Sequence, residues 1–211
     1  TAIKQEFGQS KLGARRSLVE HSSFDLSTED LITPTDMVVT LSHSGYIKSQ
    51  PLSEYRAQKR GGRGKQATAT KEDDWVDQLF IANTHDYILC FSNRGRLYWL
   101  KVWEVPQGSR GSRGRPIVNM FPLQEGEKVN VVLPLTGEKR SFPADQYVFM
   151  GTSMGTVKKT ALDEFNNPRK GGIIAVNLDE GDYLIGAALT DGKHDVMLFS
   201  DGGKAVRFDE N

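Results

Sequence analysis

The sequence contains one short stretch whose residue types suit the binding of phosphate groups. Residues 58–66 read QKRGGRGKQ, with four positive charges and three glycines among nine residues. Such a stretch could be the phosphate loop of an ATPase, a disordered RNA-binding tract, or a loop that grips a nucleic-acid backbone. An ATPase loop needs a glycine five residues before Gly-Lys and a Ser or Thr after it, but Lys59 and Gln66 occupy these places. The ATPase interpretation is therefore excluded.

The side chains that most often carry catalysis are scattered along the chain. His21, His43, His85 and His194 lack the spacing of metal ligands, and the sequence has no nucleophile elbow. Cys90 lies in the apolar run YILCF without a neighbouring His or positive cluster, which predicts a buried structural thiol. We therefore expect this chain to carry no catalytic residue, no metal site and no cofactor of its own.

The composition indicates a chain with a hydrophobic core and with charges sorted by position. The 211 residues are 37% hydrophobic, and Lys plus Arg equals Asp plus Glu at 27 each. Residues 18–46 contain acids but no Lys or Arg, whereas residues 56–65 contain basic residues but no acid, and such islands set the local field that a polyanion meets. No long apolar run or secretory signal is present, so we expect a cytoplasmic protein without a membrane partner.

Four segments repeat one pattern: an apolar run, Ser or Thr, two variable residues, Gly, and a strand with basic residues. They read VVTLSHSGYIK, YILCFSNRGRLY, YVFMGTSMGTVKK and VMLFSDGGKAVR, and they share Gly45, Gly95, Gly155 and Gly203. Short apolar runs rich in β-branched and aromatic residues around a turn glycine predict β-hairpins. Repeats of about 50 residues with several strands each are typical of propeller blades. The predicted fold is all-β and propeller-like, with roughly four blades.

A Gly-rich basic loop follows each of the first three hairpins. Gly64 and Gly114 lie 19 residues beyond their hairpin glycine, and Gly172 lies 17 beyond. Because matching positions on a ring lie along one rim, we expect the loops QKRGGRGK, SRGSRGRP and PRKGG to line the same rim. Residues 1–27 read as a linker and residues 28–211 as the domain, with the last blade incomplete.

Basic residues of the second hairpin strands extend this rim into a positive belt. Arg and Lys contact phosphates and glycines let backbone amides approach closely, yet such loops do not read base identity. Single strands require aromatic stacking platforms, which the loops lack, so duplex bound along a curved belt is predicted. The predicted DNA-binding residues are Gln58, Lys59, Arg60, Gly61, Gly62, Arg63, Gly64, Lys65, Lys48, Arg94, Arg96, Arg110, Arg113, Arg115, Lys158, Lys159, Arg169, Lys170, Lys204 and Arg207.

Residues 58–64 and their flanks resemble a known family. QKRGGRG matches at every position the seven-residue GyrA box of bacterial DNA gyrase, whose pattern is Gln, Arg/Lys, Arg, Gly, Gly, Arg/Lys, Gly. The segments VVTLSHSGYIKSQPLSEYRAQ, ANTHDYILCFSNRGRLY, RGRPIVN and GTVKKT are also similar to the C-terminal domain of the gyrase A chain, and IKQEFG resembles the end of the helix leaving the catalytic core. The resemblance covers essentially the whole chain. The box is specific, because the related topoisomerase IV chain carries only degenerate versions.

The resemblance implies a β-pinwheel, a propeller-like disc whose blades exchange strands with their neighbours. It further implies that the domain wraps duplex DNA with positive handedness, so that ATP use by the gyrase holoenzyme yields negative supercoils. Within the box, Lys59, Arg60 and Arg63 would contact phosphates, while Gly61, Gly62 and Gly64 would shape the loop. The family domain usually has five or six blades, so this chain is expected to be a fragment without autonomous topoisomerase activity.

The implied partners are duplex DNA, the core of GyrA, and GyrB in a heterotetramer associated with the bacterial nucleoid. ATP and magnesium would belong to other parts of that enzyme. Two other interpretations stay open. A topoisomerase IV-type domain would bind DNA without strong wrapping, which the intact box argues against. A propeller-like protein-binding module would need exposed apolar or aromatic loops in place of Gly-Arg ones.

Overall fold

The computed structural model describes residues 2–8, 28–55, 74–109 and 111–211, and within these ranges its secondary structure consists of thirteen β-strands, short 3-10 turns and one short α-helix. A six-residue helix, α1 (Ala2–Phe7), covers the segment that resembles the end of a core helix. The residues from Ile32 onward form one compact unit. The predicted all-β class is confirmed. Most of the predicted linker lies outside the described residues, so its boundary at residue 27 stays a prediction.

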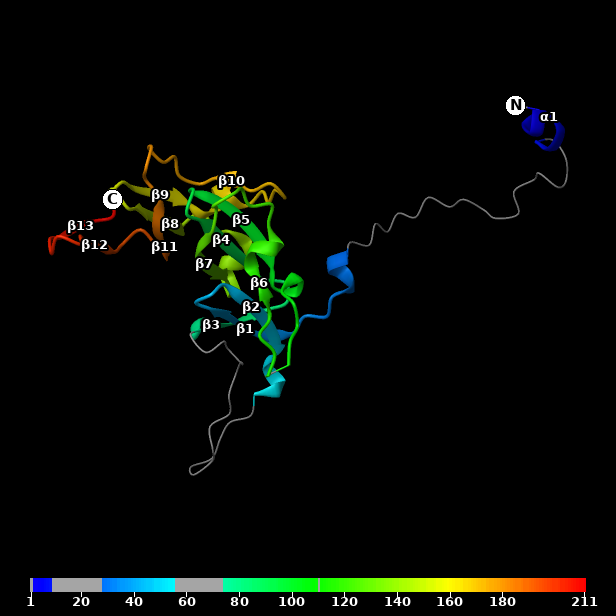
Figure 1. Cartoon of the computed structure of the whole chain (residues 1–211), viewed down its shortest axis with the longest axis horizontal. Coiled ribbons are helices and arrows are strands. Elements are labelled where there is room, and N and C mark those ends of the chain that lie inside the picture. Colours follow the sequence, from blue (N-terminus) through cyan, green and yellow to red (C-terminus); the bar gives the residue numbers. More distant parts are fainter. Residues whose placement is uncertain (1, 9–27, 56–73, 110) are drawn as a thin grey trace, which may run out of the picture. The chain divides into compact units, whose positions relative to one another are not determined.

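All four predicted hairpins are present as antiparallel strand pairs. They are β1 (Asp36–Ser42) with β2 (Tyr46–Pro51), β4 (Tyr87–Ser92) with β5 (Arg96–Lys101), β8 (Tyr147–Thr152) with β9 (Val157–Ala161), and β12 (Asp195–Phe199) with β13 (Ala205–Asp209). Each of the first three hairpins gains a further antiparallel strand on its first strand: β3 (Val76–Asn83), β7 (Val129–Leu135) and β11 (Leu184–Thr190). Figure 1 shows these sheets following one another through the unit.

The repeated Ser/Thr-x-x-Gly pattern is explained by the hairpin turns. The four turn glycines have φ between +70° and +88°, a region that favours glycine because it has no Cβ. In the first turn the amide of Gly45 donates to the Ser42 carbonyl at 2.8 Å, and the Ser42 hydroxyl accepts from the Tyr46 amide at 3.1 Å. The same two bonds recur in the other three turns. The repeat therefore encodes a turn whose polar backbone groups are satisfied locally.

Two short strands connect successive repeats. β6 (Arg115–Pro116) follows the second hairpin in sequence but pairs with β2 of the first, through Ile47 opposite Arg115. β10 (Ile173–Ile174) follows the third hairpin but pairs with β5 of the second, through Leu97 opposite Ile173. The resulting strand orders are β3-β1-β2-β6, β10-β5-β4-β7, β11-β8-β9 and β12-β13. This exchange of strands between neighbouring repeats is the expected pinwheel arrangement.

Short 3-10 turns close many of these elements. In chain order they are η1 (Thr28–Leu31), η2 (Leu52–Glu54), η3 (Val102–Glu104), η4 (Ile117–Met120), η5 (Gly137–Ser141) and η6 (Leu162–Phe165). Three of them, η2, η3 and η6, come directly after the second strands of the first three hairpins. After η3 and η6 the chain runs into the loops that carry Arg113 and Arg169.

The hydrophobic core consists of two clusters on opposite faces of the second sheet. Because side chains alternate along a strand, Ile88 and Cys90 of β4 join one cluster while Leu89 and Phe91 join the other. The first cluster packs against the first sheet through residues such as Val39, and the second includes residues of β8 and η6. Cys90 is fully buried as predicted, and burial raises the pKa of its thiol.

Candidate nucleic-acid interface

The loop of residues 106–117 lies along the second strand of the first hairpin. Backbone bonds join Ser49 to the Pro106 carbonyl at 3.0 Å, Gly108 to the Ser49 carbonyl at 3.1 Å and Ile117 to the Gly45 carbonyl at 2.8 Å. Gly114 has φ +85°, and a Cβ there would clash with the carbonyl oxygen of Ile47. The glycine is therefore required for close packing of this loop on the preceding hairpin.

The loop before β10 has the corresponding position on the second hairpin. The amide of Ala175 donates to the Gly95 carbonyl at 2.8 Å, as Ile117 does to Gly45. Gly172 has φ +67°, and a Cβ there would come within 2.7 Å of the Leu97 carbonyl oxygen. The sequence predicts that the loop glycines let backbone amides approach phosphates closely. The structure corrects this prediction for Gly114 and Gly172, because these two glycines approach the backbone of the neighbouring repeat.

Both loops carry exposed cations. The side chains of Arg113, Arg115, Arg169 and Lys170 are exposed, and no described residue is hydrogen-bonded or ion-paired to them. Lys204, in the turn of the fourth hairpin, has the same properties. Exposed cations without internal partners can contact phosphate oxygens at little cost, because no protein bond has to break.

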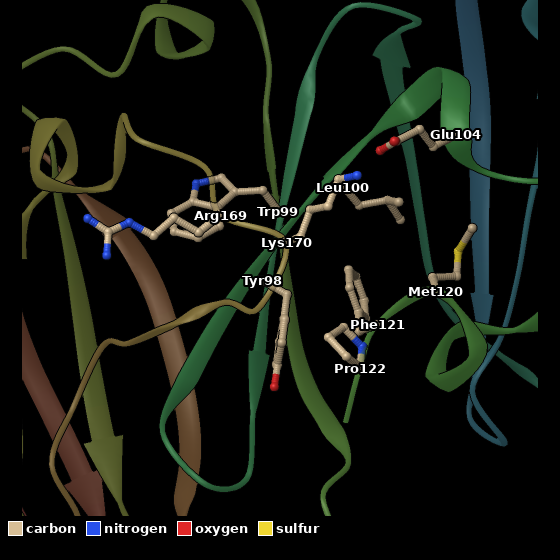
Figure 2. Close-up of a pocket in the computed structure, with 9 residues that line it drawn as sticks. All are labelled: Tyr98, Trp99, Leu100, Glu104, Met120, Phe121, Pro122, Arg169 and Lys170. Carbon is tan, nitrogen blue, oxygen red and sulfur yellow. The ribbon is translucent and has the colours of Figure 1, made fainter. Parts of the chain in front are cut away.

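A cavity of about 550 Å³ lies beside the second of these loops. Its walls come from β5, from the segment after η4 and from the loop before β10, and nine of its lining residues are drawn in Figure 2. The guanidinium of Arg169 points away from the rings of Tyr98 and Phe121 (Figure 2). This direction leaves it available to a ligand outside the cavity.

The aromatic side chains of this region serve packing. Tyr98 is 1% exposed, stacks on Phe121 with ring centroids 5.1 Å apart, and donates to Glu127. Trp99 donates its indole N–H to the Phe165 carbonyl at 2.9 Å. The ring of Tyr98 is therefore covered and offers no open face on which a base could stack. Trp99 is half-buried and is fixed at its edge by the bond to Phe165.

Five other predicted site residues already hold a partner. Arg94 donates to Gln124 and to the Glu125 carbonyl, and Arg96 donates to the Gly171 carbonyl at 2.6 Å. Lys158 donates to the Ala175 carbonyl, Lys159 to Asn211, and Arg207 is ion-paired with Asp195. Apart from half-buried Arg96 and Lys159, these side chains are exposed, and exposed pairs of this kind contribute little to stability. Arg94, Lys158 and Arg207 can therefore exchange their protein partner for a phosphate.

The structure corrects the sequence-based prediction that Lys48 binds DNA. Its side chain lies inside the protein, with 1% of the residue exposed. Its ammonium donates to the carbonyl oxygens of Ser109 at 3.0 Å and Ser112 at 2.9 Å. A group this deeply buried cannot reach a phosphate, so Lys48 is a structural residue of the loop. The sequence pattern could not distinguish it from Lys158, which has the same position in its hairpin but is exposed.

The remaining predicted residues, Gln58, Lys59, Arg60, Gly61, Gly62, Arg63, Gly64, Lys65 and Arg110, lie outside the described residues. Their role in DNA binding stays a prediction.

Sequence reasoning missed a carboxylate that supports each of the first three hairpin turns. Asp74 accepts from the Ser44 amide at 2.9 Å, and Asp182 accepts from the Ser153 hydroxyl at 2.7 Å and the Met154 amide at 3.0 Å. Glu127 has the corresponding place in the second repeat. Their signal in the sequence is an acid 27 to 32 residues after each hairpin glycine.

These carboxylates stay ionised well into the acid range. For Asp182, burial raises the pKa, but hydrogen bonds from Thr152, Ser153, Met154 and Tyr183 together lower it to about 2. Burial opposed by hydrogen bonds likewise leaves the pKa of Asp74 and of Glu127 below the usual range. The negative charges are therefore held at the turns, bound to hydroxyl and amide groups.

Metal-binding clusters and membrane-spanning helices are both absent from the described ranges. Within them, no group of three or more His, Cys, Asp or Glu side chains converges as a metal site would require. None of the helices described there is long and apolar enough to cross a membrane.

The chain matches a family described as the DNA gyrase C-terminal domain, a β-propeller. Residues 36–83, 86–135, 146–191 and 194–211 each match in turn, in agreement with four repeats. The GyrA chain of DNA gyrase from Aeromonas salmonicida is 53% identical over 209 residues, which are 99% of this chain and 22% of that protein. The chain therefore spans less than a quarter of the length of this relative.

Solved structures show the same fold. The C-terminal domain of DNA topoisomerase IV aligns with a TM-score of 0.72 at 28% identity, covering 85% of this chain and 53% of the other. A DNA gyrase A C-terminal domain aligns with a TM-score of 0.57 at 24% identity, covering 83% and 55%. The strand exchange, the four successive matches and the high identity to GyrA agree. The chain belongs to the DNA gyrase C-terminal domain family.

Proposed function

We propose that this chain binds duplex DNA without sequence preference and wraps it with positive handedness. In the gyrase holoenzyme, this wrap would direct ATP-dependent strand passage toward negative supercoiling. The chain itself would supply no catalytic residue and no cofactor. ATP, magnesium and the strand-cleaving groups would lie in the core of GyrA and in GyrB, as parts of a heterotetramer in the bacterial cytoplasm at the nucleoid.

One observation carries the proposal: two equivalent loops, each packed on the preceding hairpin, present exposed cations without described partners. Arg113 and Arg115 flank Gly114, and Arg169 and Lys170 precede Gly172. Contacts repeated from one repeat to the next suit a curved duplex, because the cost of bending is then offset along the whole arc. The same cations contact phosphate and do not read base edges from a Gly-rich loop, which supports binding without sequence preference.

Ligation of nicked circular DNA in the presence of increasing amounts of this chain tests the proposal. A wrap held during ligation is trapped as a change in linking number, and we expect the topoisomers to shift in the positive direction. The quadruple variant Arg113→Ala, Arg115→Ala, Arg169→Ala and Lys170→Ala should shift them less at equal concentration. Binding without any change of linking number would contradict the wrapping.

That last outcome would favour the second candidate, a topoisomerase IV-type domain that binds DNA without strong wrapping. The likeness of the fold to a topoisomerase IV C-terminal domain, with a TM-score of 0.72, keeps this candidate open. The complete QKRGGRG box and the 53% identity to a GyrA chain favour wrapping.

A further inference from the structure

The loop that carries Arg113 and Arg115 is fastened to the first hairpin at both ends. Near its start, the Gln50 side chain donates to the Gly108 carbonyl at 2.9 Å, in addition to the backbone bonds with Ser49. At its end, β6 pairs with β2 and Ile117 bonds to Gly45. Between these points, the described residues of the loop are held to the hairpin by a side chain.

That side chain is Lys48. Its ammonium bonds to the carbonyls of Ser109 and Ser112, and the loop curls around it, with the Ser112 amide donating to the Ser109 carbonyl at 3.0 Å. The Lys48 Cβ also lies 3.1 Å from the place that a Cβ on Gly114 would occupy. Lys48 thus lies against the loop at two places. One is Ser112, directly before Arg113, and the other is Gly114, which stands between the two exposed arginines.

A buried ammonium has a specific energetic consequence for the loop. Removal of its hydration is costly, and burial lowers the pKa of Lys48. The charge is tolerated because carbonyl oxygens replace water, so movement of Ser109 and Ser112 away from Lys48 would take two acceptors from a buried cation. The ammonium therefore penalises loop conformations other than the one described.

We infer that Lys48 is a positioning residue for DNA binding: its buried ammonium holds Ser109 and Ser112 so that Arg113 and Arg115 project from a fixed loop toward duplex phosphates. This inference rests on the proposed function. Lys48 itself contacts no DNA. Its contribution to affinity is the ordering of the loop before DNA arrives, so that less conformational entropy is lost on binding.

The second loop has an anchor of the same kind. The guanidinium of Arg96, on β5, donates to the Gly171 carbonyl, directly after the exposed pair Arg169 and Lys170. Arg96 stands one residue after its hairpin glycine and Lys48 three residues after, so the anchors differ in position and in side chain. A basic side chain from the preceding hairpin nevertheless holds the loop backbone at both junctions.

The test compares Lys48→Met, which keeps the apolar stem and removes the ammonium, with a control, Lys128→Met. Lys128 is exposed and lies outside the predicted interface, so its replacement removes one positive charge without touching the loop. Both changes are made in the 211-residue chain and in its Arg113→Ala/Arg115→Ala variant. Affinity for a mixed-sequence linear duplex is measured at several salt concentrations.

We expect Lys48→Met to weaken binding about three- to tenfold in the parent, the size of an ordering cost for one or two side chains. It should have no effect in the Arg113→Ala/Arg115→Ala background, and it should leave the salt slope of the parent unchanged. Lys128→Met should not weaken binding. Hydrogen exchange should accelerate at the amides of residues 111–115 in Lys48→Met, with the amides of β8 and β9 unaffected.

Three outcomes would overturn the inference. An equal loss of affinity in both backgrounds would show that Lys48 does not act through the arginines. A salt slope reduced by about 0.9 would indicate a direct phosphate contact. Unchanged exchange in the loop would show that Lys48 does not order it. If Lys48→Met does not fold, Lys48→Gln, which keeps a donor group, serves in the same comparison.

Failure of the proposed function is distinguishable from these outcomes. If the parent chain does not bind duplex, both the proposed function and the DNA-binding role of Lys48 fall. Faster exchange in Lys48→Met would then show that Lys48 anchors the loop for a different purpose.

Discussion

The backbone amide of Ala175 donates a 2.8 Å hydrogen bond to the carbonyl of Gly95, across eighty residues of sequence. Ile117 and Gly45 make the same bond at the previous junction. Each hairpin turn of the first two repeats is therefore completed by the repeat that follows it. At Gly95 the hairpin glycine has two functions, the turn itself and the room for the next loop, since an added Cβ would lie 2.4 Å from the Val176 carbonyl oxygen.

A comparison of two hairpin glycines distinguishes the turn from the packing of the next loop. Gly155 has φ +88° and no atom within 4 Å of an added Cβ, whereas at Gly95, with φ +70°, the Cβ would meet the backbone and side chain of Val176. We expect Gly155→Ala to cost about 1–2 kcal/mol, the penalty of a left-handed conformation. Gly95→Ala should cost about 1–3 kcal/mol more, because the Val176 backbone must move. Urea unfolding measures both, and equal losses would show that the junction adapts without cost.

Acid should destabilise the fold through the carboxylates at the turns. The pKa of Asp182 in the folded chain is about 2, below its ordinary value of 3.8, so its stabilising effect is complete above 3.8 and is lost as pH falls through 2. Thermal melting between pH 5 and pH 2 should therefore show a smaller pH-dependent loss in Asp182→Ala than in the parent. An equal pH-dependent loss in the parent and in Asp182→Ala would show that this carboxylate does not stabilise the fold.

Duplex binding should weaken steeply with salt. With about five to eight phosphates neutralised, the slope of log K against log salt should lie near −4 to −7. Arg113→Ala/Arg115→Ala should reduce its magnitude by up to about 1.8, since each phosphate contact contributes about 0.9. Lys128→Ala/Lys193→Ala removes two exposed charges outside the predicted interface and should leave the slope nearly unchanged. Identical slopes for the two double variants would show that the loops do not form the contact surface.

The QKRGGRG box should determine the direction of supercoiling. Replacement of residues 58–64 by alanine in a complete gyrase should abolish ATP-dependent negative supercoiling but spare DNA cleavage and ATP-independent relaxation. The physical reason is that the end of the bent duplex is released once phosphate contacts no longer offset its bending. The three activities are compared on one plasmid. Normal supercoiling by the variant would show that the box is not needed for the wrap. Equal loss of all three activities would indicate misfolding.

The hairpins could be predicted because their signals are local. The Ser/Thr and Gly of each turn lie within four residues and bond to one another, so the pattern in sequence is also the pattern of contacts. The sequence predicts where the loops lie along the chain, but it does not predict which residues they pack against. Nothing near Gly114 indicates that it packs on Ile47, because that contact depends on how two repeats dock.

Lys48 shows the same limit for the site. Its neighbours in sequence are those of an exposed strand residue, and only the loop of the next repeat buries it. Exposure of a side chain on a repeat is thus decided by residues some sixty positions away. The structure leaves exposed the cations that stand on the loops themselves, such as Arg113 and Arg169, and their contact with DNA stays a prediction.

The pairing of β2 with β6 has a consequence for the order in which the protein is made. Tyr46 pairs with Pro116, so a ribosome has to synthesise seventy further residues before the edge of the first sheet can be covered. During that interval the nascent chain exposes a strand edge, which is the kind of surface through which unfinished β-proteins associate wrongly. β10 covers the edge of β5 in the same way, so the first two sheets each become complete only after part of the following repeat has been made.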